Sequence, residues 1–294
     1  MKLYQENNKV IIDKIKDFEP KHIFECGQCF RWDKEEDGSY TGVANGKILN
    51  VKLEGDTLIL DNTNLDDYHR IWHNYFDMDR DYSAIKAELA QMDEHLYNAT
   101  IFGQGMRILN QDTFEIVISF IISARNAIPM IKRSVAFLSK ALGEEIGEYR
   151  GKKYYAFPTP KALSSCDEQV LIDSKVAFRK GYIRDASYIQ HSLQMDMYKL
   201  RNLPTDMARK ELMTIPGVGP KVSDCILLFG LSKYDVFPVD VWVQRVMHEF
   251  YIEKEMKDLK KIREFGIDMF KDKSGIAQQY LFYYAREKVG SCKM

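Results

Sequence analysis

The stretch ELMTIPGVGPKVSDCILLFG, residues 211–230, decides the fold of the second half of the chain. Within it, Pro-Gly-Val-Gly at 216–219 interrupts a helical pattern with two glycines, which adopt backbone angles that other residues resist. A second helix is predicted from about Pro220, because apolar residues then recur at i, i+3, i+4 and i+7. These are Val222, Cys225, Ile226 and Phe229. The sequence therefore predicts two helices joined by a tight hairpin over 205–230, with Thr205 capping the first helix.

This hairpin has two interpretations. Gly217 and Gly219 would leave several backbone N–H groups unpaired at a helix N-terminus, where a phosphate can approach closely. A plain corner between two helices is the commoner reason for a Gly-x-Gly turn. Lys221 favours the first interpretation, since it lies in the first turn of the second helix, where the helix dipole disfavours a cation by roughly 0.3–1 kcal/mol. The pKa of its amine should therefore fall, as imine-forming chemistry requires.

A second candidate residue lies in VFPVDVWVQRV, residues 236–246. Asp240 follows a β-branched, Pro-containing connection and precedes an apolar-periodic helix. Aspartate is a preferred N-cap residue worth about 1 kcal/mol, so a structural role alone explains it. A catalytic role is compatible, because a carboxylate held by backbone N–H groups stays ionised and can stabilise a developing cation.

The first part of the chain has the pattern of a small antiparallel sheet. Between about Val10 and Leu60, the runs YTGVANG, KILNVKL and DTLIL alternate or are β-branched, with turn signals between them. From Asp66 the pattern is helical to the end, apart from loops near 149–160 and 202–205. We predict an α+β protein, with an N-terminal antiparallel β-sheet domain over 1–78 and a larger all-helical domain over 79–294.

One helix of the second domain is well marked. Asp112 and Glu115 form a capping box before the apolar run TFEIVISFIIS, so the helix should begin there and lie buried. Arg125 and Asn126 follow at its end, and Pro129 begins another helix. Polar residues at such a tip are most often solvated loop residues.

The composition excludes several classes of protein. The 294 residues carry 42 Lys and Arg against 43 Asp and Glu, so bulk positive charge does not predict a nucleic-acid binder. Five cysteines in a chain of this length argue against a secreted disulfide framework, and the first residues lack the apolar core of a signal peptide. No apolar run is long enough to span a bilayer. A cytoplasmic protein without a targeting signal is expected.

Four segments resemble 8-oxoguanine DNA glycosylase/AP lyases of the helix-hairpin-helix, Gly-Pro-Asp superfamily. In the family's order they are GQCFRW, QDTFEIVISFIISARNAI, LMTIPGVGPKVSDC with VFPVDVWVQRV, and GIAQQYLFYYA. The resemblance covers nearly the whole chain. It implies a bifunctional base-excision repair enzyme that acts as a nucleoid-associated monomer on double-stranded DNA containing 8-oxoguanine.

The resemblance assigns the chemistry to two residues. Lys221 would attack C1′ of the damaged nucleotide, and Asp240 would stabilise the oxocarbenium-like transition state. The resulting Schiff base would permit β-elimination and hence strand cleavage. Such an enzyme must extrude its target base from the duplex into a pocket.

The implied pocket for the base has four members. Cys225 and Phe282 match its two faces and Gln278 matches the residue on the Watson–Crick edge, although helix-core packing also explains each of them. The backbone carbonyl of Gly27 matches the group that senses the lesion. Guanine presents N7 as an acceptor, whereas 8-oxoguanine carries a hydrogen there, and glycine lets the backbone come close.

The resemblance also implies contacts with DNA outside the pocket. The residues assigned to DNA are Arg125, Asn126, Met130, Gly217, Gly219 and Trp242. Arg125 and Asn126 would fill the gap left by the extruded base. Trp242 replaces a histidine of eukaryotic members. Met130 replaces an arginine that reads the opposite cytosine, and its thioether cannot donate those hydrogen bonds. Weaker discrimination of the opposite base is therefore predicted.

No cofactor is expected for catalysis. The backbone carbonyls of Met213, Ile215 and Val218 match hairpin positions that hold a structural monovalent or calcium ion in the superfamily. Related branches with an iron–sulfur cluster carry four cysteines near the C-terminus, where this chain has only Cys292, so no cluster is expected.

Cys26 and Cys29 form a C-x-x-C pair that raises the alternatives of a zinc site or a redox site. No second ligand pair completes a zinc site. The strand-and-turn context does not suit a redox pair, which needs its first cysteine at a helix N-terminus. The pair is therefore interpreted as the small neighbours that shape the loop around Gly27.

Two other functions are alternatives to that of an 8-oxoguanine DNA glycosylase/AP lyase. Alkylpurine glycosylases share the aspartate but lack the hairpin lysine, so Lys221 argues against them. A non-catalytic DNA-binding module would use the hairpin only to grip phosphate. It predicts no covalent trapping on DNA and no need for both Lys221 and Asp240.

Overall fold

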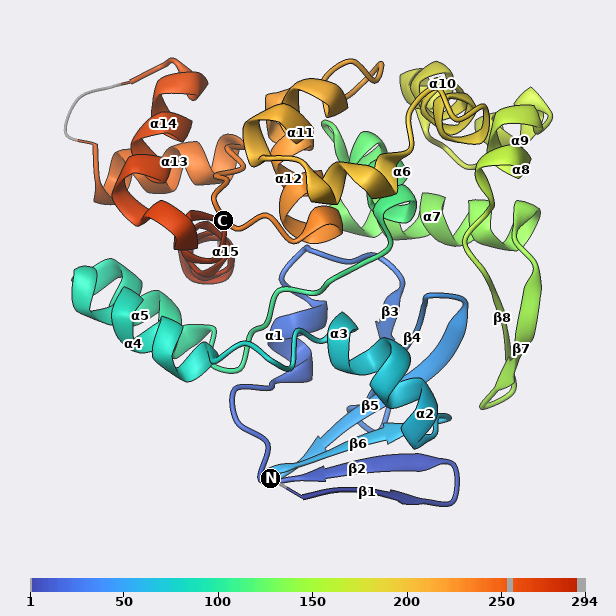
Figure 1. Ribbon diagram of the computed structural model, residues 1–294, viewed down its shortest axis with the longest axis horizontal. Helices are drawn as coiled ribbons and strands as arrows, with labels where there is room; N and C mark the ends of the chain where they lie inside the picture. The colour runs from blue at the N-terminus through green and yellow to red at the C-terminus, as the bar shows by residue number, and fades with distance from the viewer. Residues whose placement is uncertain (1, 253–255, 290–294) are drawn as a thin grey trace.

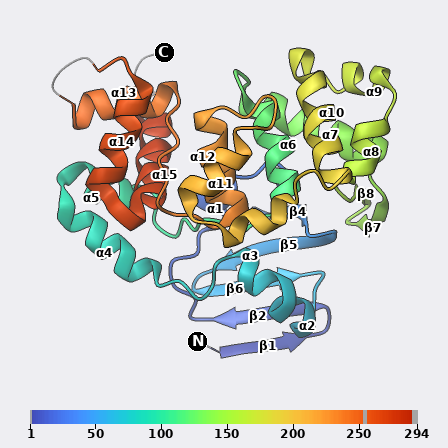
Figure 2. The ribbon, with the colours of Figure 1, turned by 45° about the horizontal axis from the view of Figure 1, so that its top comes forward.

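The computed structural model describes residues 2–252 and 256–289, and it places a group of helices over one antiparallel sheet (Figures 1 and 2). The sheet has six strands in the order β1-β2-β6-β5-β4-β3, and every neighbouring pair is antiparallel. The strands are β1 (Lys2–Glu6), β2 (Lys9–Asp13), β3 (Trp32–Lys34), β4 (Tyr40–Ala44), β5 (Lys47–Glu54) and β6 (Thr57–Asp61). The predicted sheet is confirmed.

Two details of this part differ from the prediction. The edge strand β1 lies before Val10, where the sheet was predicted to start. It was not predicted because its mostly exposed residues show no alternation of apolar and polar positions. The short helix α1 (Pro20–Phe24) interrupts the strands, with Glu19 accepting a hydrogen bond from Lys21 N at its start. This helix ends just before the loop that contains Gly27.

The rest of the described chain is mostly helical, as predicted. The longer helices are α4 (Tyr82–Met92), α5 (Glu94–Phe102), α6 (Thr113–Ser123), α7 (Ile128–Leu142), α10 (Lys180–His191), α11 (Thr205–Leu212), α12 (Pro220–Leu231), α13 (Val241–Phe250), α14 (Leu259–Phe270) and α15 (Ser274–Tyr284). The shorter ones are α2 (Leu65–Asp67), η1 (Tyr68–Trp72), α3 (His73–Tyr75), α8 (Pro160–Ser165), α9 (Glu168–Asp173), η2 (Ala177–Arg179), η3 (Met197–Asn202), η4 (Lys271–Lys273) and η5 (Ala285–Val289). No described helix is long and apolar enough to cross a membrane.

The prediction of an all-helical second domain was wrong at one place. Strands β7 (Glu145–Tyr149) and β8 (Lys152–Tyr155) form an antiparallel hairpin beside the sheet in Figure 1, where a helical pattern followed by a loop near 149–160 was expected. Its turn residues Arg150 and Gly151 have φ angles of 51° and 73°, as a two-residue hairpin turn requires. Arginine seldom occupies the first of these positions, so no turn was predicted here from the sequence.

The helix boundaries follow the predicted caps in one case and not in another. Asp112 caps α6 by accepting a hydrogen bond from Glu115 N at 2.9 Å, as predicted. The side chain of Glu115 does not complete the box but pairs with Arg31 at 3.3 Å. The predicted Thr205 cap is wrong, because Thr205 is the first residue of α11 and its hydroxyl donates to Asp235 at 2.7 Å.

The two hydrophobic cores interlock at the junction between sheet and helices. Cys26 and Phe30, from the sheet-domain half of the chain, belong to the core of the helices. Leu109, from the segment that leads into α6, belongs to the core under the sheet. A division of the chain at residue 78 stays a prediction.

A buried cluster of three charged residues joins α11, α12 and α14. The carboxylate of Asp224, fully buried on α12, accepts from Arg209 Nε at 2.8 Å and from Arg263 Nε at 2.6 Å. A buried carboxylate between two guanidinium groups is held in place, because moving it would break both charge-assisted hydrogen bonds. The cluster therefore fixes α12, which carries Lys221.

Replacing Asp224 with Asn should lower the free energy of unfolding by about 3–5 kcal/mol, because Arg263 loses its described carboxylate partner and Arg209 keeps only the exposed Asp206. Asp206→Asn is the matched control: Asp206 pairs with the same Arg209 at 2.6 Å, but its side chain is 88% exposed. That substitution should cost less than about 1 kcal/mol. Urea unfolding of both variants measures the difference, and equal losses would contradict the assignment.

Candidate active site

A small cavity of about 50 Å³ brings together the residues that sequence reasoning assigned to chemistry and to the base pocket. Its lining contains all six of them: Gly27, Lys221, Cys225, Asp240, Gln278 and Phe282. The remaining lining residues are Phe120, Phe229, Pro238 and Gln279. These residues come from the loop after α1, from α6, α12 and α15, and from the connection into α13. A cavity of this size holds only one or two waters, so a purine base would have to widen it.

Lys221 reaches this cavity because α12 begins where the hairpin ends. Gly219 is the N-cap and Pro220 the first helical residue, as predicted, so Lys221 lies in the first turn. Its Nζ lies 5.1 Å from the centroid of the Phe120 ring, against which Phe229 stacks at 5.5 Å. No ion pair joins it to a carboxylate within the described residues. The amine therefore faces aromatic rings in a largely apolar pocket.

Cys225 lies one helical turn after Lys221 and is 4% exposed. Burial raises the pKa of its thiol to about 11, and the neighbouring Lys221 ammonium only partly offsets that rise. The side chain is therefore a neutral thiol at neutral pH. Such a group offers a small apolar wall and does not compete as a nucleophile.

Asp240 caps α13, as predicted. Its Oδ1 accepts hydrogen bonds from the backbone N–H groups of Trp242 and Val243 at 2.9 and 2.8 Å. No described donor meets Oδ2. One oxygen therefore anchors the side chain, and the other is available to face a positive charge in the cavity.

Gln278 and Phe282 lie four residues apart on α15 and so project from the same side of the helix. Gln278 is 4% exposed, and its Oε1 is buried without a hydrogen-bond partner. A buried, unpaired acceptor costs roughly 1–3 kcal/mol, so its presence in a pocket needs an explanation. A ligand that donates a hydrogen bond would supply one.

Gly27 needs to be glycine for two reasons. Its φ is +89°, a left-handed conformation that side chains disfavour. A Cβ atom there would also lie 3.2 Å from Nη1 of Arg286 and 3.4 Å from Cδ1 of Ile128. No donor of the described residues meets its carbonyl oxygen, so this oxygen is free to accept from a ligand.

The thiols of the C-x-x-C pair around Gly27 are shielded from solvent. Cys26 and Cys29 are buried, and burial raises the pKa of both thiols, that of Cys29 well above its usual value. Reactive cysteines show the opposite shift. Within the residues that the structure describes, no three His, Cys, Asp or Glu side chains lie together as a metal site.

The loop after α6 separates the roles of its two predicted DNA-binding residues. Arg125 is exposed, has a φ of 51° and makes no described side-chain contact. The amide of Asn126 is already engaged, donating to Ile122 O at 3.2 Å and accepting from Ala127 N at 3.0 Å. Arg125 is therefore the side chain that can reach a ligand.

Sequence reasoning missed the residue that holds this loop. Arg179 is 4% exposed, and its guanidinium donates to the carbonyl of Ala124, through Nε at 3.0 Å, and to that of Arg125, through Nη2 at 3.2 Å. A buried arginine that serves two carbonyls 55 and 54 positions away leaves no signal in a single sequence.

Met130 and Trp242 are not among the residues that line the small cavity. Met130, in the first turn of α7, is 37% exposed and so presents its thioether to solvent. Trp242 is half-buried, and the Arg245 guanidinium lies 5.3 Å from its ring centroid.

The hairpin before α12 has the features expected of a phosphate-binding turn. Gly217 has a φ of +86°, and a Cβ there would lie 2.7 Å from the Tyr182 ring. The N–H groups of Gly217 and Gly219 have no described acceptor. Oriented, unpaired N–H groups at a helix start attract anions.

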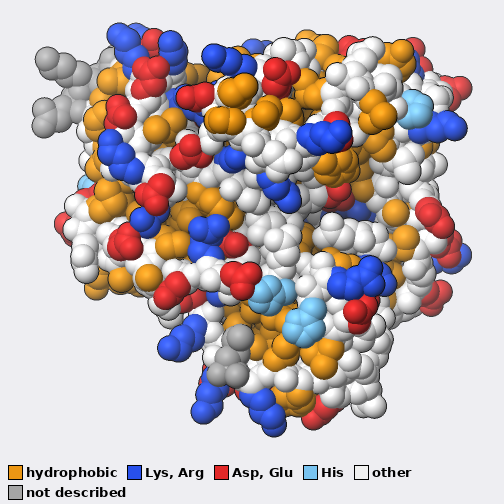
Figure 3. Space-filling view, in the orientation of Figure 1, with side chains coloured by type: hydrophobic (Ala, Val, Ile, Leu, Met, Phe, Trp, Pro, Cys, Tyr) orange, Lys and Arg blue, Asp and Glu red, His pale blue; other side chains and the backbone are white. Residues whose placement is uncertain are grey.

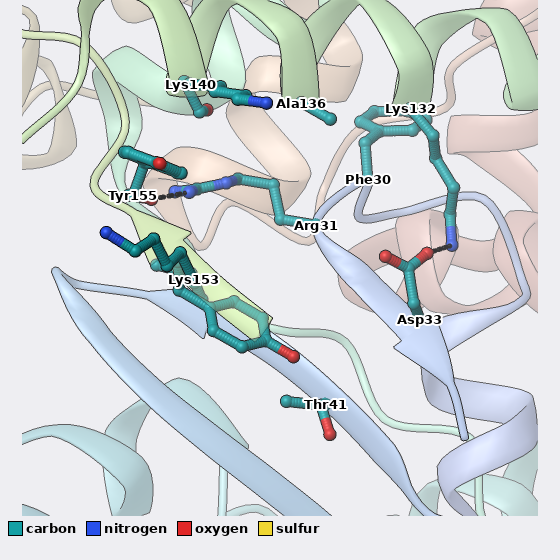
Figure 4. A pocket seen from close by; sticks show the side chains of 12 residues that line it. Phe30, Arg31, Asp33, Thr41, Lys132, Ala136, Lys140, Lys153 and Tyr155 are labelled. Atoms are coloured by element: carbon teal, nitrogen blue, oxygen red, sulfur yellow. Dashed lines mark hydrogen bonds and ion pairs between the residues drawn. The ribbon is translucent and has the colours of Figure 1, made fainter. Parts of the chain in front are cut away.

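A larger cavity, of about 250 Å³, lies apart from these residues, between α7, β8 and the strands β3 and β4 (Figure 4). It is rich in cations, but three of them are engaged in ion pairs: Arg31 with Glu115, Lys132 with Asp33, and Lys153 with Glu145. It contains none of the six residues of the small cavity. Size alone therefore does not mark the active site.

Comparison with known proteins identifies relatives of this chain. Residues 10–117 match the family model of the 8-oxoguanine DNA glycosylase N-terminal domain. A probable N-glycosylase/DNA lyase of Methanothermobacter thermautotrophicus is 32% identical over 214 residues, which cover 66% of this chain and 68% of the relative. The chain belongs to the 8-oxoguanine DNA glycosylase family.

Solved structures of family members extend the match over almost the whole chain. The Clostridium acetobutylicum 8-oxoguanine glycosylase/lyase, bound to double-stranded DNA with cytosine opposite 8-oxoguanine, superposes with a TM-score of 0.95 at 42% identity. That match covers 98% of this chain and 99% of the other. MBOgg1, in complex with a low-affinity DNA ligand, gives 0.94 at 49% identity, with 97% and 98% covered. Cys292, on which the expectation of no iron–sulfur cluster rested, lies outside the described residues.

The cysteines of the folded protein should differ in their rates of alkylation. Cys26, Cys29 and Cys225 should react with iodoacetamide at pH 8 at least roughly tenfold more slowly than the half-buried Cys166, because their thiols are buried and their pKa values are raised. Peptide mapping by mass spectrometry measures this, with the urea-unfolded chain as the control. Rapid labelling of Cys26 or Cys29 would instead indicate a reactive pair.

Proposed function

We propose that this protein excises 8-oxoguanine from duplex DNA and then cleaves the strand through a Schiff base on Lys221. The observation that carries the proposal is a pair of unpaired acceptors lining one cavity: the buried Oε1 of Gln278 and the free carbonyl of Gly27. The amine of Lys221 and the carboxylate of Asp240 line the same cavity. Recognition and chemistry would thus share one site.

The two acceptors select one kind of base. Gln278 Oε1 suits the Watson–Crick edge of a guanine-type base, which donates from N1 and the exocyclic amine. The Gly27 carbonyl suits the N7–H of 8-oxoguanine but opposes the N7 lone pair of guanine. A site whose buried polar groups are satisfied by one ligand and left unpaired by another discriminates strongly. Phe282 and the Cys225 thiol offer the two apolar faces.

Lys221 is the proposed nucleophile at C1′ of the sugar. The neutral amine forms a bond to C1′ while the N-glycosidic bond breaks, and the electron pair leaves with the base. After the amine loses a proton, the sugar ring opens to a protonated Schiff base. Abstraction of a C2′ proton then breaks the C3′–O bond and releases the 3′ phosphate. Asp240 would stabilise the positive charge that develops on the sugar.

The hairpin is the proposed grip on the DNA backbone. Its free N–H groups at Gly217 and Gly219 suit a phosphate. The carbonyls of Met213 and Val218 accept from no described donor, and that of Ile215 accepts from Val218 N at 3.0 Å. Oxygen atoms of this kind suit a hard cation, so we propose that these three carbonyls hold a monovalent or calcium ion that adds positive charge beside the phosphate. All the proposed groups come from one chain, which supports a monomer acting on nucleoid DNA.

Borohydride should trap the wild-type protein covalently on a duplex containing 8-oxoguanine, and Lys221→Gln should abolish the adduct because no amine remains to form the imine. Lys233→Gln, which alters a lysine bonded to Leu203 O outside the site, is the control and should keep the adduct. Asp240→Asn should slow excision by about 10²–10³ with DNA affinity retained. No adduct from the wild type would leave a non-catalytic DNA-binding module as the better interpretation.

The opposite base should matter little. With Met130 in place of a hydrogen-bond donor, excision rates from duplexes with C, A, G or T opposite the lesion should lie within about tenfold of one another, because no bidentate contact selects cytosine. Met130→Arg should increase the preference for cytosine. Single-turnover kinetics on the four duplexes provide the measurement, and a strong cytosine preference in the wild type would refute the argument.

A further inference from the structure

The loop that carries Gly27 has its carbonyl groups occupied in an unusual pattern. Arg286 Nη2 donates to Glu25 O at 2.5 Å, Gln279 Nε2 to Cys26 O at 3.0 Å, and Gln111 Nε2 to Gln28 O at 2.9 Å. Of the four consecutive carbonyls, only that of Gly27 accepts from no described donor. Side chains from distant parts of the chain thus hold the carbonyls on either side of it.

Two of these donors come from the C-terminal helices, next to the residues that face the base. Gln279 directly follows Gln278 on α15 and is 3% exposed. Both glutamines line the small cavity. Successive residues of a helix project about 100° apart, and the Gln279 amide is the one that bonds to the loop. Arg286 lies on η5, with its guanidinium 5.4 Å from the ring centroid of Phe282 and 5.5 Å from that of Tyr283.

Without these hydrogen-bond donors, the loop around Gly27 could adopt other conformations. Glycine accepts both signs of φ, so the peptide groups around Gly27 can rotate at little steric cost. Rotation would turn the Gly27 carbonyl away from a bound base or bring an N–H in its place. Hydrogen bonds to the carbonyls of Cys26 and Gln28 oppose this, because each rotation would leave a buried acceptor unpaired.

We infer that Gln279 and Arg286 are positioning residues for lesion recognition, which hold the Gly27 carbonyl as the free acceptor of the loop. The inference rests on the proposed function, because it concerns how the same pocket tells 8-oxoguanine from guanine. It assigns no chemistry to either residue. The two act through Gly27, and bond breaking stays with Lys221 and Asp240.

The test separates recognition of the base from chemistry at the sugar. A preformed abasic site lacks the base, so its cleavage needs the lysine but not the Gly27 carbonyl. Gln279→Met keeps the length of the side chain and removes the donor. It should lower single-turnover excision of 8-oxoguanine by about tenfold or more while abasic-site cleavage stays within about twofold of wild type.

Two further variants guard against a general effect on folding. Arg286→Lys keeps a cationic donor and should retain more excision activity than Arg286→Met. Gln190→Met removes a buried helical glutamine of α10 whose amide oxygen accepts from Met197 N at 2.9 Å, far from the loop in sequence. Any loss it causes should affect both reactions equally.

The outcomes are distinct. Unchanged excision in Gln279→Met, or an equal fall in both reactions, would overturn the inference and leave the proposed function intact. A wild-type protein that cleaves abasic sites but does not excise 8-oxoguanine would overturn both. Selective loss of excision, with the ratio of the two rates restored toward wild type in Arg286→Lys relative to Arg286→Met, would support the positioning role.

Discussion

The arrangement of the site depends on one buried amide. The side chain of Gln28 is fully buried, and its Nε2 donates to Ile23 O at 2.9 Å and to Arg107 O at 2.8 Å, while its Oε1 accepts from Leu109 N at 2.9 Å. The amide therefore joins the loop after α1 to the segment that leads into α6. A buried polar group satisfied at every position fixes geometry, since any shift would break several bonds at once. It sets the loop of Gly27 against the segment that leads into α6, the helix whose Phe120 ring lies beside Lys221.

In the proposed function, the protein contacts the polyanion through locally oriented groups and not through bulk charge. The formal net charge is −1, and on the face shown in Figure 3 cationic and anionic side chains are interspersed. What the hairpin offers instead is a set of directed N–H groups, whose positions Gly217 and Gly219 make accessible. Affinity built on a few oriented contacts depends less on long-range attraction and more on geometry.

The sequence predicted what is local and missed what is distant. The hairpin, the start of α12 and the Asp240 cap depend on neighbours within a few positions, and the printed order of residues contains that information. The β7–β8 turn was not predicted because Arg150 adopts a left-handed conformation that arginine seldom adopts. Arg179 and Gln279 were missed for a different reason. Each donates a hydrogen bond to a carbonyl oxygen far along the chain, and the neighbouring residues in the sequence do not identify that partner.

The two proposed catalytic residues differ in their effect on the stability of the helices that carry them. Lys221 occupies the start of α12, where the helix dipole disfavours it by roughly 0.3–1 kcal/mol, and no carboxylate of the described chain compensates it. Asp240 occupies the start of α13, where capping stabilises by about 1 kcal/mol. Helix α12 is instead anchored through Asp224, which lies three residues after Lys221 and pairs with Arg209 and Arg263. Lys221 therefore needs no carboxylate partner to hold α12 in place, because Asp224, Arg209 and Arg263 anchor the helix.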